Sequence, residues 1–128
     1  MKLASHIAGV LLGLGFILFG SMFFLGKMPP PPPVGTPPGD FFAAVGPTGY
    51  MSFVKVLEIL GGVLVAIPLT RNLGLLVLGP IIVNILCFHV FLAKCAYIAD
   101  PVLITICVLA AFLLWAERKV WSGLLGQA

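Results

Sequence analysis

Four long runs of apolar residues constrain this chain more than any other feature of its sequence. An α-helix needs about 20 mostly apolar residues to cross the hydrocarbon core of a bilayer, which is roughly 30 Å thick. The runs predict membrane-spanning helices at residues 5–26, 50–69, 73–92 and 101–115. The first run is longer than the roughly 7–15-residue core of a signal peptide, so we predict a retained span. The last run is the shortest, and we expect it to recruit flanking residues or to cross a thinner region.

Composition supports a chain that lies mostly in lipid. Hydrophobic residues make up 61% of the sequence and charged residues 9%, whereas about 25% of the residues of a soluble domain are charged. The seven basic residues are scattered at the ends of the apolar runs rather than gathered in a patch. This pattern predicts the lipid bilayer as the main partner and gives no support for nucleic-acid binding. We therefore treat residues 1–128 as a single transmembrane domain.

The connection between the first two runs, residues 28–39, is rich in proline. Because proline lacks a backbone N–H and has a fixed φ, we expect an extended spacer here and no helix. Residues 40–46 are too few to cross a membrane. We expect them to form an interfacial turn of helix with Asp40 as its N-cap.

The connections between the second, third and fourth runs are short, so neighbouring helices should be antiparallel. The predicted fold is an all-α, integral membrane four-helix bundle with up-down topology, which places both termini on one side. The basic residues divide four to three between the two sides: Lys2, Arg71, Arg118 and Lys119 lie on the side of the termini, and Lys27, Lys55 and Lys94 lie on the other. The positive-inside rule then favours cytoplasmic termini.

Small residues form a stripe along the first predicted span. Gly9 and Gly13 make a GxxxG step, and Gly20 continues the stripe one heptad later. Because glycine lets two backbones approach closely, we expect these residues to form a helix-packing face.

Polar residues within the spans gather in one leaflet of the predicted bundle. These candidates for a polar pocket are Lys27, Lys55, Glu58, Asn84 and His89. A charge costs several kcal/mol in hydrocarbon unless it is paired, so Glu58 should face the bundle and find a partner. Lys55 is the local candidate, because residues three apart share a helix face. Two interpretations stay open: a structural clasp that fixes helix register, and a pocket that handles protons or binds a ligand.

The sequence gives little support for an intrinsic cofactor. His89 is the one histidine at its predicted depth, since His6 belongs to the opposite leaflet, which excludes a bis-histidine haem within the chain. A tetrapyrrole on His89 is a weaker hypothesis than a hydrogen bond to Glu58 or to a loop carbonyl. The three cysteines include no CxxC pair, and we expect no metal site.

Parts of the chain resemble the DoxX family of membrane proteins. The resemblance rests on Leu57–Leu64 for the second helix, Pro80–His89 for the third, and Phe19–Ser21 with Lys27 for the first. It implies a small four-helix protein of the bacterial inner membrane. Some members are subunits of thiosulfate:quinone oxidoreductase, and others are linked to oxidative-stress and thiol pathways. The proline run at residues 29–33 departs from the family pattern and puts any function of the first loop in doubt.

Two functions follow as expectations. The first is a DoxX-like protein linked to quinone or thiol chemistry through the polar pocket. In it Glu58 is the proton acceptor or anchor, Asn84 orients the ligand by hydrogen bonding, and Lys27 or Lys55 is the counter-charge. The alternative is a non-catalytic accessory subunit of a larger electron-transfer or photosynthetic membrane complex. Its apolar exterior and its glycine stripe would then be docking surfaces for other membrane subunits. The sequence does not decide whether the chain is an enzyme.

Overall fold

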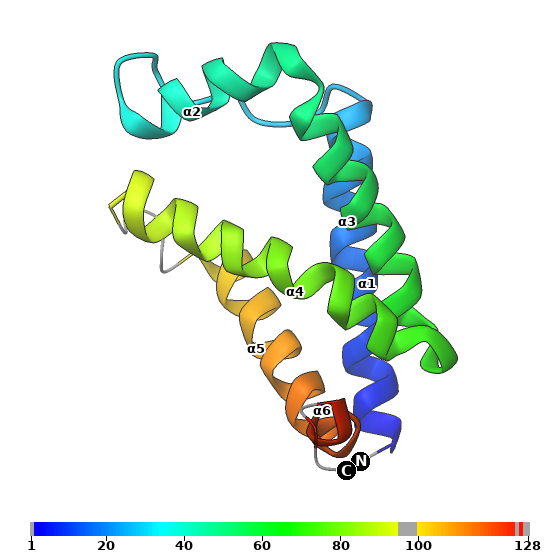
Figure 1. Ribbon diagram of the computed structural model, residues 1–128. Coiled ribbons are helices and arrows are strands. Elements are labelled where there is room, and N and C mark those ends of the chain that lie inside the picture. The colour runs from blue at the N-terminus through cyan, green and yellow to red at the C-terminus, as the bar shows by residue number, and fades with distance from the viewer. Residues whose placement is uncertain (1, 95–99, 125, 127–128) are drawn as a thin grey trace.

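The computed structural model describes residues 2–94, 100–124 and 126, and these residues form helices joined by turns and short irregular segments (Figure 1). The α-helices are α1 (Lys2–Phe24), α2 (Pro37–Val45), α3 (Tyr50–Ala66), α4 (Arg71–Cys87), α5 (Pro101–Ala116) and α6 (Arg118–Leu124). Single 3₁₀ turns lie at Gly46–Thr48 and Pro68–Thr70, and a π-helical turn at Phe88–Leu92 extends α4. The all-helical class predicted from the sequence is confirmed for this part of the chain.

Two helical segments are long and apolar enough to cross a membrane by themselves. They are Lys2–Phe24, with 23 residues, and Pro68–Leu92, with 25. Two further candidates are bent pairs, Pro37–Thr48 with Tyr50–Ala66 at 88° and Pro101–Ala116 with Arg118–Leu124 at 70°. At about 1.5 Å per residue, α3 and α5 alone are each about 25 Å long, somewhat less than the hydrocarbon core. The described residues thus provide two to four candidate spans.

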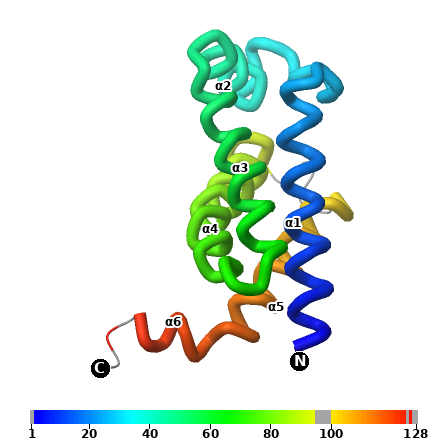
Figure 2. The backbone as a smooth tube through the Cα atoms, turned by 90° about the vertical axis from the view of Figure 1, so that its right-hand side faces the viewer, coloured from blue at the N-terminus to red at the C-terminus, as the bar shows by residue number. Residues whose placement is uncertain are grey.

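The long helices do not lie parallel throughout. Helices α1 and α3 run side by side, whereas α4 packs on α3 at its start and then diverges toward its C-terminal end (Figure 1). Helix α5 packs mainly on α1 and touches α4 little. Helix α6 turns away from the other helices at the end where α1 begins (Figure 2).

The core lies where α1, α3, α4 and α5 meet. Its most deeply buried side chains are Leu12, Phe16, Val65, Leu78 and Leu113. Large apolar side chains elsewhere on the same helices are exposed, among them Leu18, Phe53 and Val83. A soluble protein rarely exposes so much contiguous apolar surface, so these faces are suited to contact with lipid.

The proline-rich connection differs from the sequence prediction. Helix α2 begins at Pro37, within the segment expected to be free of helix, and its N-cap is Thr36 rather than Asp40. The Thr36 hydroxyl accepts a hydrogen bond from the Gly39 N–H (3.3 Å) and donates one to the carbonyl oxygen of Pro33 (2.7 Å). The physical reason is that the first turn of a helix needs no N–H donors, so prolines there start a helix instead of preventing it. The Asp40 carboxylate instead accepts a hydrogen bond from the Gly35 N–H.

Two other features lie beyond the sequence prediction. Helix α4 runs through Pro80 without ending, and the departure from α-helical geometry follows it at the π-helical turn. Lys94 follows the π-helical turn and has a positive φ of 51°. Residues Arg118–Leu124, which follow the last predicted span, form the further helix α6.

Candidate functional site

The ion pair of Lys55 and Glu58 is the part of the predicted polar pocket that the structure brings together. The Lys55 Nζ lies 3.3 Å from Glu58 Oε2, and the two residues are three apart on one face of α3. Glu58 is 4% exposed, and only 11% of the Lys55 side chain is accessible. Because a buried carboxylate needs a nearby donor, Lys55 neutralises Glu58 within the same helix.

The other predicted pocket residues lie apart from this pair. Lys27 is exposed in the turn that follows α1, and Asn84 is exposed on α4. The His89 Nδ1 lies 2.8 Å from the carbonyl oxygen of Ile85 in its own helix. No hydrogen bond or ion pair joins Glu58 to Lys27, Asn84 or His89. For Asn84 and His89 the divergence of α4 from α3 accounts for this, since it carries the C-terminal half of α4 away from α3 (Figure 1).

An aromatic cluster of Phe41, Phe42 and Phe88 lies beside His89. The Phe88 ring contacts Phe41 and Phe42 of α2, with centroid distances of 5.6 and 5.3 Å. His89 packs edge-on against Phe88 at 5.6 Å. These contacts attach α2 to the end of the α4 segment. His89 therefore forms its hydrogen bond within its own helix segment, and none with Glu58.

The predicted glycine stripe lies at the contact of α1 with α3 and with the start of α4. A Cβ on Gly13 would collide with the carbonyl oxygen of Gly62, and a Cβ on Gly20 would lie 2.6 Å from Ile59. A Cβ on Gly9 would lie 2.6 Å from the guanidinium of Arg71. The absence of side chains at these positions is what allows the helices to pack closely.

A second polar cluster, at the C-terminal end of α3, was not predicted from the sequence. Arg71 is 2% exposed and donates from Nε to the carbonyl oxygen of Val65 (3.1 Å). The Thr70 hydroxyl donates to the carbonyl oxygen of Leu64 (2.8 Å). Both bonds satisfy carbonyl groups at the C-terminus of α3, where the helix dipole favours a cation. A basic residue directly after a predicted helix end was the available signal, but Arg71 was used in the sequence analysis only to predict the topology.

Asn72 extends this cluster to the C-terminal part of the chain. Its Nδ2 donates to Glu117 Oε2 at 3.3 Å and so ties the start of α4 to the end of α5. Two buried atoms of the cluster, Arg71 Nη2 and Asn72 Oδ1, have no hydrogen-bond partner among the described residues, and neither has Trp121 Nε1 of α6. Buried polar groups nearly always form a hydrogen bond, so buried atoms without one are unusual.

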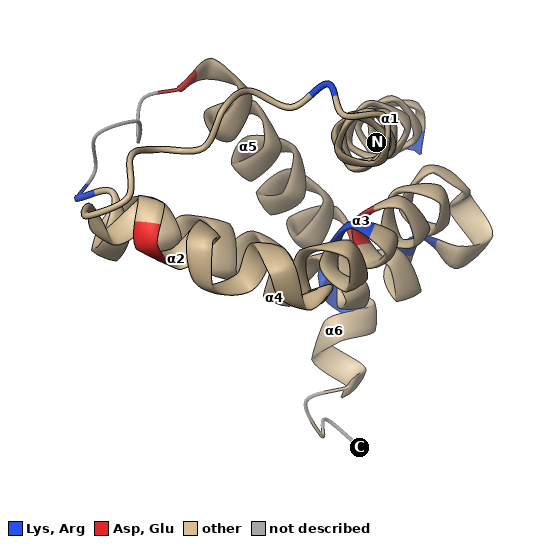
Figure 3. Ribbon diagram, turned by 90° about the horizontal axis from the view of Figure 1, so that it is seen from above, with Lys and Arg blue, Asp and Glu red and all other residues tan. Residues whose placement is uncertain are grey.

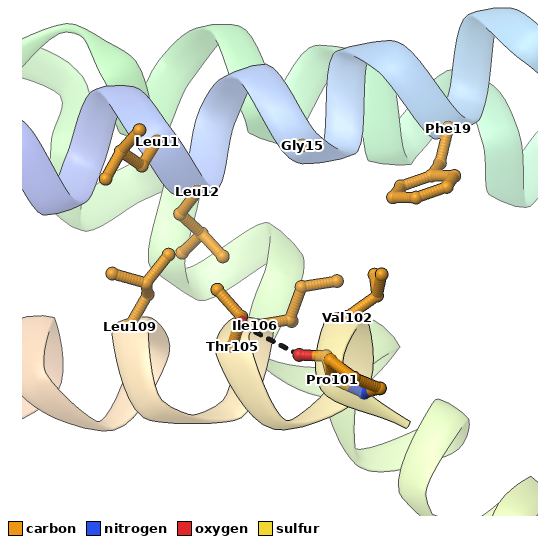
Figure 4. A pocket seen from close by; sticks show the side chains of 9 residues that line it. All are labelled: Leu11, Leu12, Gly15, Phe19, Pro101, Val102, Thr105, Ile106 and Leu109. Atoms are coloured by element: carbon orange, nitrogen blue, oxygen red, sulfur yellow. Dashed lines mark hydrogen bonds between the residues drawn. The ribbon is translucent and has the colours of Figure 1, made fainter. Parts of the chain in front are cut away.

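Two cavities lie away from the Lys55–Glu58 pair. The first, of about 230 Å³, lies between α1 and α5, and Figure 4 shows its walls. It is lined by Leu11, Leu12, Gly15, Phe19, Pro101, Val102, Thr105, Ile106 and Leu109. The Thr105 hydroxyl, its one side-chain polar group, donates to the carbonyl oxygen of Pro101 (2.7 Å) and is thereby satisfied. The second cavity, of about 350 Å³, lies between α4 and α6.

Neither of these cavities is lined by Glu58, Asn84 or His89. Within the described residues, His, Cys, Asp and Glu form no group of three that could hold a metal ion. Cys87 and Cys107 are free thiols, and Cys95 lies outside the described residues. In the described residues the Lys55–Glu58 ion pair is nearly covered and lies apart from these two mainly apolar cavities.

Comparison with known proteins does not assign the chain to a family. No family model, no curated protein and no solved structure matches the chain. The resemblance to the DoxX family therefore rests on the sequence segments alone.

Proposed function

We propose that the chain is a non-catalytic accessory subunit of a larger membrane complex, of the electron-transfer or photosynthetic kind. In this proposal each bent pair of helices forms one span, so that the chain crosses the membrane four times. Its termini are cytoplasmic, and the resemblance to DoxX proteins favours the bacterial inner membrane. The chain would act by docking to other membrane subunits.

The apolar cavity between α1 and α5 carries this proposal. Its nine lining residues offer aliphatic and aromatic surface and no free hydrogen-bonding side chain. Gly15 lies on its wall with nothing within 4 Å of where its Cβ would be. Such a surface matches the side of a partner helix, because helices associate in lipid through close packing of small and apolar residues.

The state of Glu58 supports the same conclusion. A ligand-binding carboxylate must be reachable, whereas a structural clasp is stabilised by excluding water. Glu58 is almost fully covered and already paired with Lys55. This arrangement fits a clasp better than a proton-handling site.

The experiment fills the cavity and leaves the fold intact. Gly15→Leu places a side chain in the space between α1 and α5, and Gly79→Leu is the matched control on α4. Gly79 also has nothing within 4 Å of a Cβ, and it does not line this cavity. Both variants should purify as folded helical proteins. The native complex, sized by electrophoresis in mild detergent and identified by mass spectrometry, should lose its partner subunits with Gly15→Leu and keep them with Gly79→Leu.

Two results would contradict this proposal. If the wild-type chain migrates as a monomer from native membranes, the accessory role fails. If Gly15→Leu leaves an existing complex intact, the partner does not dock between α1 and α5.

A quinone-linked function is the second candidate, and the same cavity is the observation that favours it. Its apolar walls match an isoprenoid tail, while the resemblance to DoxX proteins supplies the chemistry. This function predicts quinone binding by the isolated protein. Binding should be weakened by Gly15→Leu and kept by Gly79→Leu, because only Gly15 lines this cavity. Quinone binding by Gly15→Leu that equals that of the wild type would count against this function.

A further inference from the structure

The five consecutive prolines at residues 29–33 lie in the connection between α1 and α2, which passes between the two helices as an extended trace (Figure 3). They form neither a helix nor a turn. Because the ring fixes φ and removes the N–H, such a run adopts the extended polyproline helix, with three residues per turn. At a rise of 3.1 Å per residue, the run is about 16 Å long.

Both ends of the run are fixed to neighbouring helices. Before it, the Lys27 N–H donates to the carbonyl oxygen of Met22 at the end of α1 (2.9 Å). After it, the Thr36 hydroxyl donates to the carbonyl oxygen of Pro33 (2.7 Å), and a Cβ on Gly39 of α2 would collide with that same oxygen. A segment held in this way has little conformational freedom left to lose when it binds a partner.

The run lies in water rather than in lipid. Within the described part of the chain, the carbonyl groups of residues 29–32 accept no hydrogen bond. Irregular backbone of this kind does not face the hydrocarbon of a bilayer, because each unsatisfied carbonyl is costly there. Lys27, directly before the run, is exposed and forms no ion pair with another described residue. The segment therefore presents apolar rings and one available cation to a water-soluble partner.

Two of the three edges of the polyproline helix face outward. Pro30 and Pro33 share one edge, Pro31 lies on the second, and all three residues are exposed. Pro32, on the third edge, is half-buried, and a Cβ on Gly39 would lie 2.9 Å from its carbonyl oxygen. Domains that recognise polyproline bind exposed rings in grooves lined by aromatic side chains.

We propose that residues 27–33 bind a water-soluble protein domain whose groove is lined by aromatic side chains and flanked by a carboxylate. The rings of Pro30 and Pro31 enter the groove, and the Lys27 ammonium group pairs with the carboxylate. The affinity comes from apolar contact with a segment that is already in its bound conformation. This surface is separate from the cavity between α1 and α5, so a failure of helix docking at that cavity leaves the inference standing.

The first test uses the full chain in neutral detergent and an SH3 domain with acidic side chains beside its aromatic groove. Calorimetry compares its affinity for the protein with its affinity for a free peptide of residues 27–36. The protein should bind about tenfold more tightly, because its segment is fixed at both ends. Pro30→Ala and Pro31→Ala should each weaken binding about fivefold, the effect of losing one apolar contact. Pro32→Ala, the same change on the inward edge, is the matched control and should bind like the wild type.

The charge has its own control. Lys27→Glu should weaken binding of the SH3 domain, whereas Lys94→Glu, which changes the net charge equally at another exposed lysine, should not. Binding of the protein no tighter than that of the peptide, equal losses in the Pro31→Ala and Pro32→Ala variants, or equal losses in the two lysine variants would overturn the proposal.

The second test uses the native complex in membranes extracted with mild detergent. An excess of the peptide of residues 27–36 should displace a soluble component, and the same peptide with Pro30 and Pro31 replaced by alanine should not. The displaced component, purified alone, should bind the first peptide and not the second. If neither peptide displaces anything, or both do so equally, the proline run is only a spacer between α1 and α2.

Discussion

Gly13 and Gly62 face each other across the contact of α1 and α3 so closely that a Cβ on Gly62 would lie 2.7 Å from the carbonyl oxygen of Gly13. The relation is reciprocal, since a Cβ on Gly13 would collide with the carbonyl oxygen of Gly62. Close backbone approach of this kind permits Cα–H···O contacts between helices. Because lipid is as apolar as the helix surface, such packing is a main source of attraction between helices in a membrane.

Gly62→Ala should therefore destabilise the protein. The new methyl group meets backbone rather than a flexible side chain, so α1 and α3 must separate, at a cost of about 1–3 kcal/mol. Thermal unfolding in detergent should show a clearly lower midpoint. Gly15→Ala is the control, because a Cβ there has nothing within 4 Å and alanine is the better helix former. A stability loss of equal size in both variants would mean that the Gly13–Gly62 contact has no special role.

Thr36→Ala should loosen the start of α2. It removes the hydroxyl that bonds both the Gly39 N–H and the Pro33 carbonyl oxygen. Loss of such an N-cap costs about 1 kcal/mol. Hydrogen exchange of the α2 amides should accelerate several-fold, while that of the α1 amides stays unchanged. Unchanged exchange in α2 would show that Pro37 and Pro38 suffice to start the helix.

The predicted topology can be tested by labelling on two sides of the membrane. Val34 is 79% exposed in the proline-rich connection, and Ser122 is exposed on α6. Val34 is preferable to Gly35, whose φ of +101° a cysteine would rarely adopt. In a background without the native cysteines, Val34→Cys should react with an impermeant thiol reagent from outside the cell. Ser122→Cys should react only after permeabilisation, and the reverse pattern would invert the topology.

The helices were predictable from the sequence because long apolar runs are a strong signal. The boundaries near 50, 71 and 101 follow from Gly49, Pro68 and Pro101, which end or start helices for local reasons. The start of α2 was missed because proline was treated only as a helix breaker. The π-helical turn and the bend before α6 have no comparable signature in the sequence.

In the polar site, only the contact between residues that are close in the sequence could be predicted. Lys55 and Glu58 share a helix face by their spacing alone, and the structure pairs them. The positions of Asn84 and His89 relative to Glu58 depend on how α4 crosses α3. The periodicity of the sequence does not determine that crossing. The bond of Asn72 to Glu117 joins residues 45 apart in the chain, and no pattern predicts such a contact.

The Lys55–Glu58 pair gives the sharpest test of the clasp interpretation. Lys55→Met leaves the covered Glu58 carboxylate without its cation, and breaking a buried pair in this way costs roughly 3 kcal/mol. Glu58→Leu should cost less, because the long side chain of Lys55 can carry its charge toward the membrane surface. Glu58→Gln should be milder still, since its amide oxygen still accepts a hydrogen bond from Lys55.

The double variant, Lys55→Met with Glu58→Leu, then decides what the pair does. Replacing both charges by apolar side chains removes the attraction together with the cost of burying them, so stability should return close to that of the wild type. Unfolding of all four proteins in one detergent gives the coupling energy directly. If the losses from the two single variants simply add, the pair contributes no coupling and the clasp interpretation fails. If the double variant is stable but its native complex is lost, the pair also holds a surface that the partner recognises.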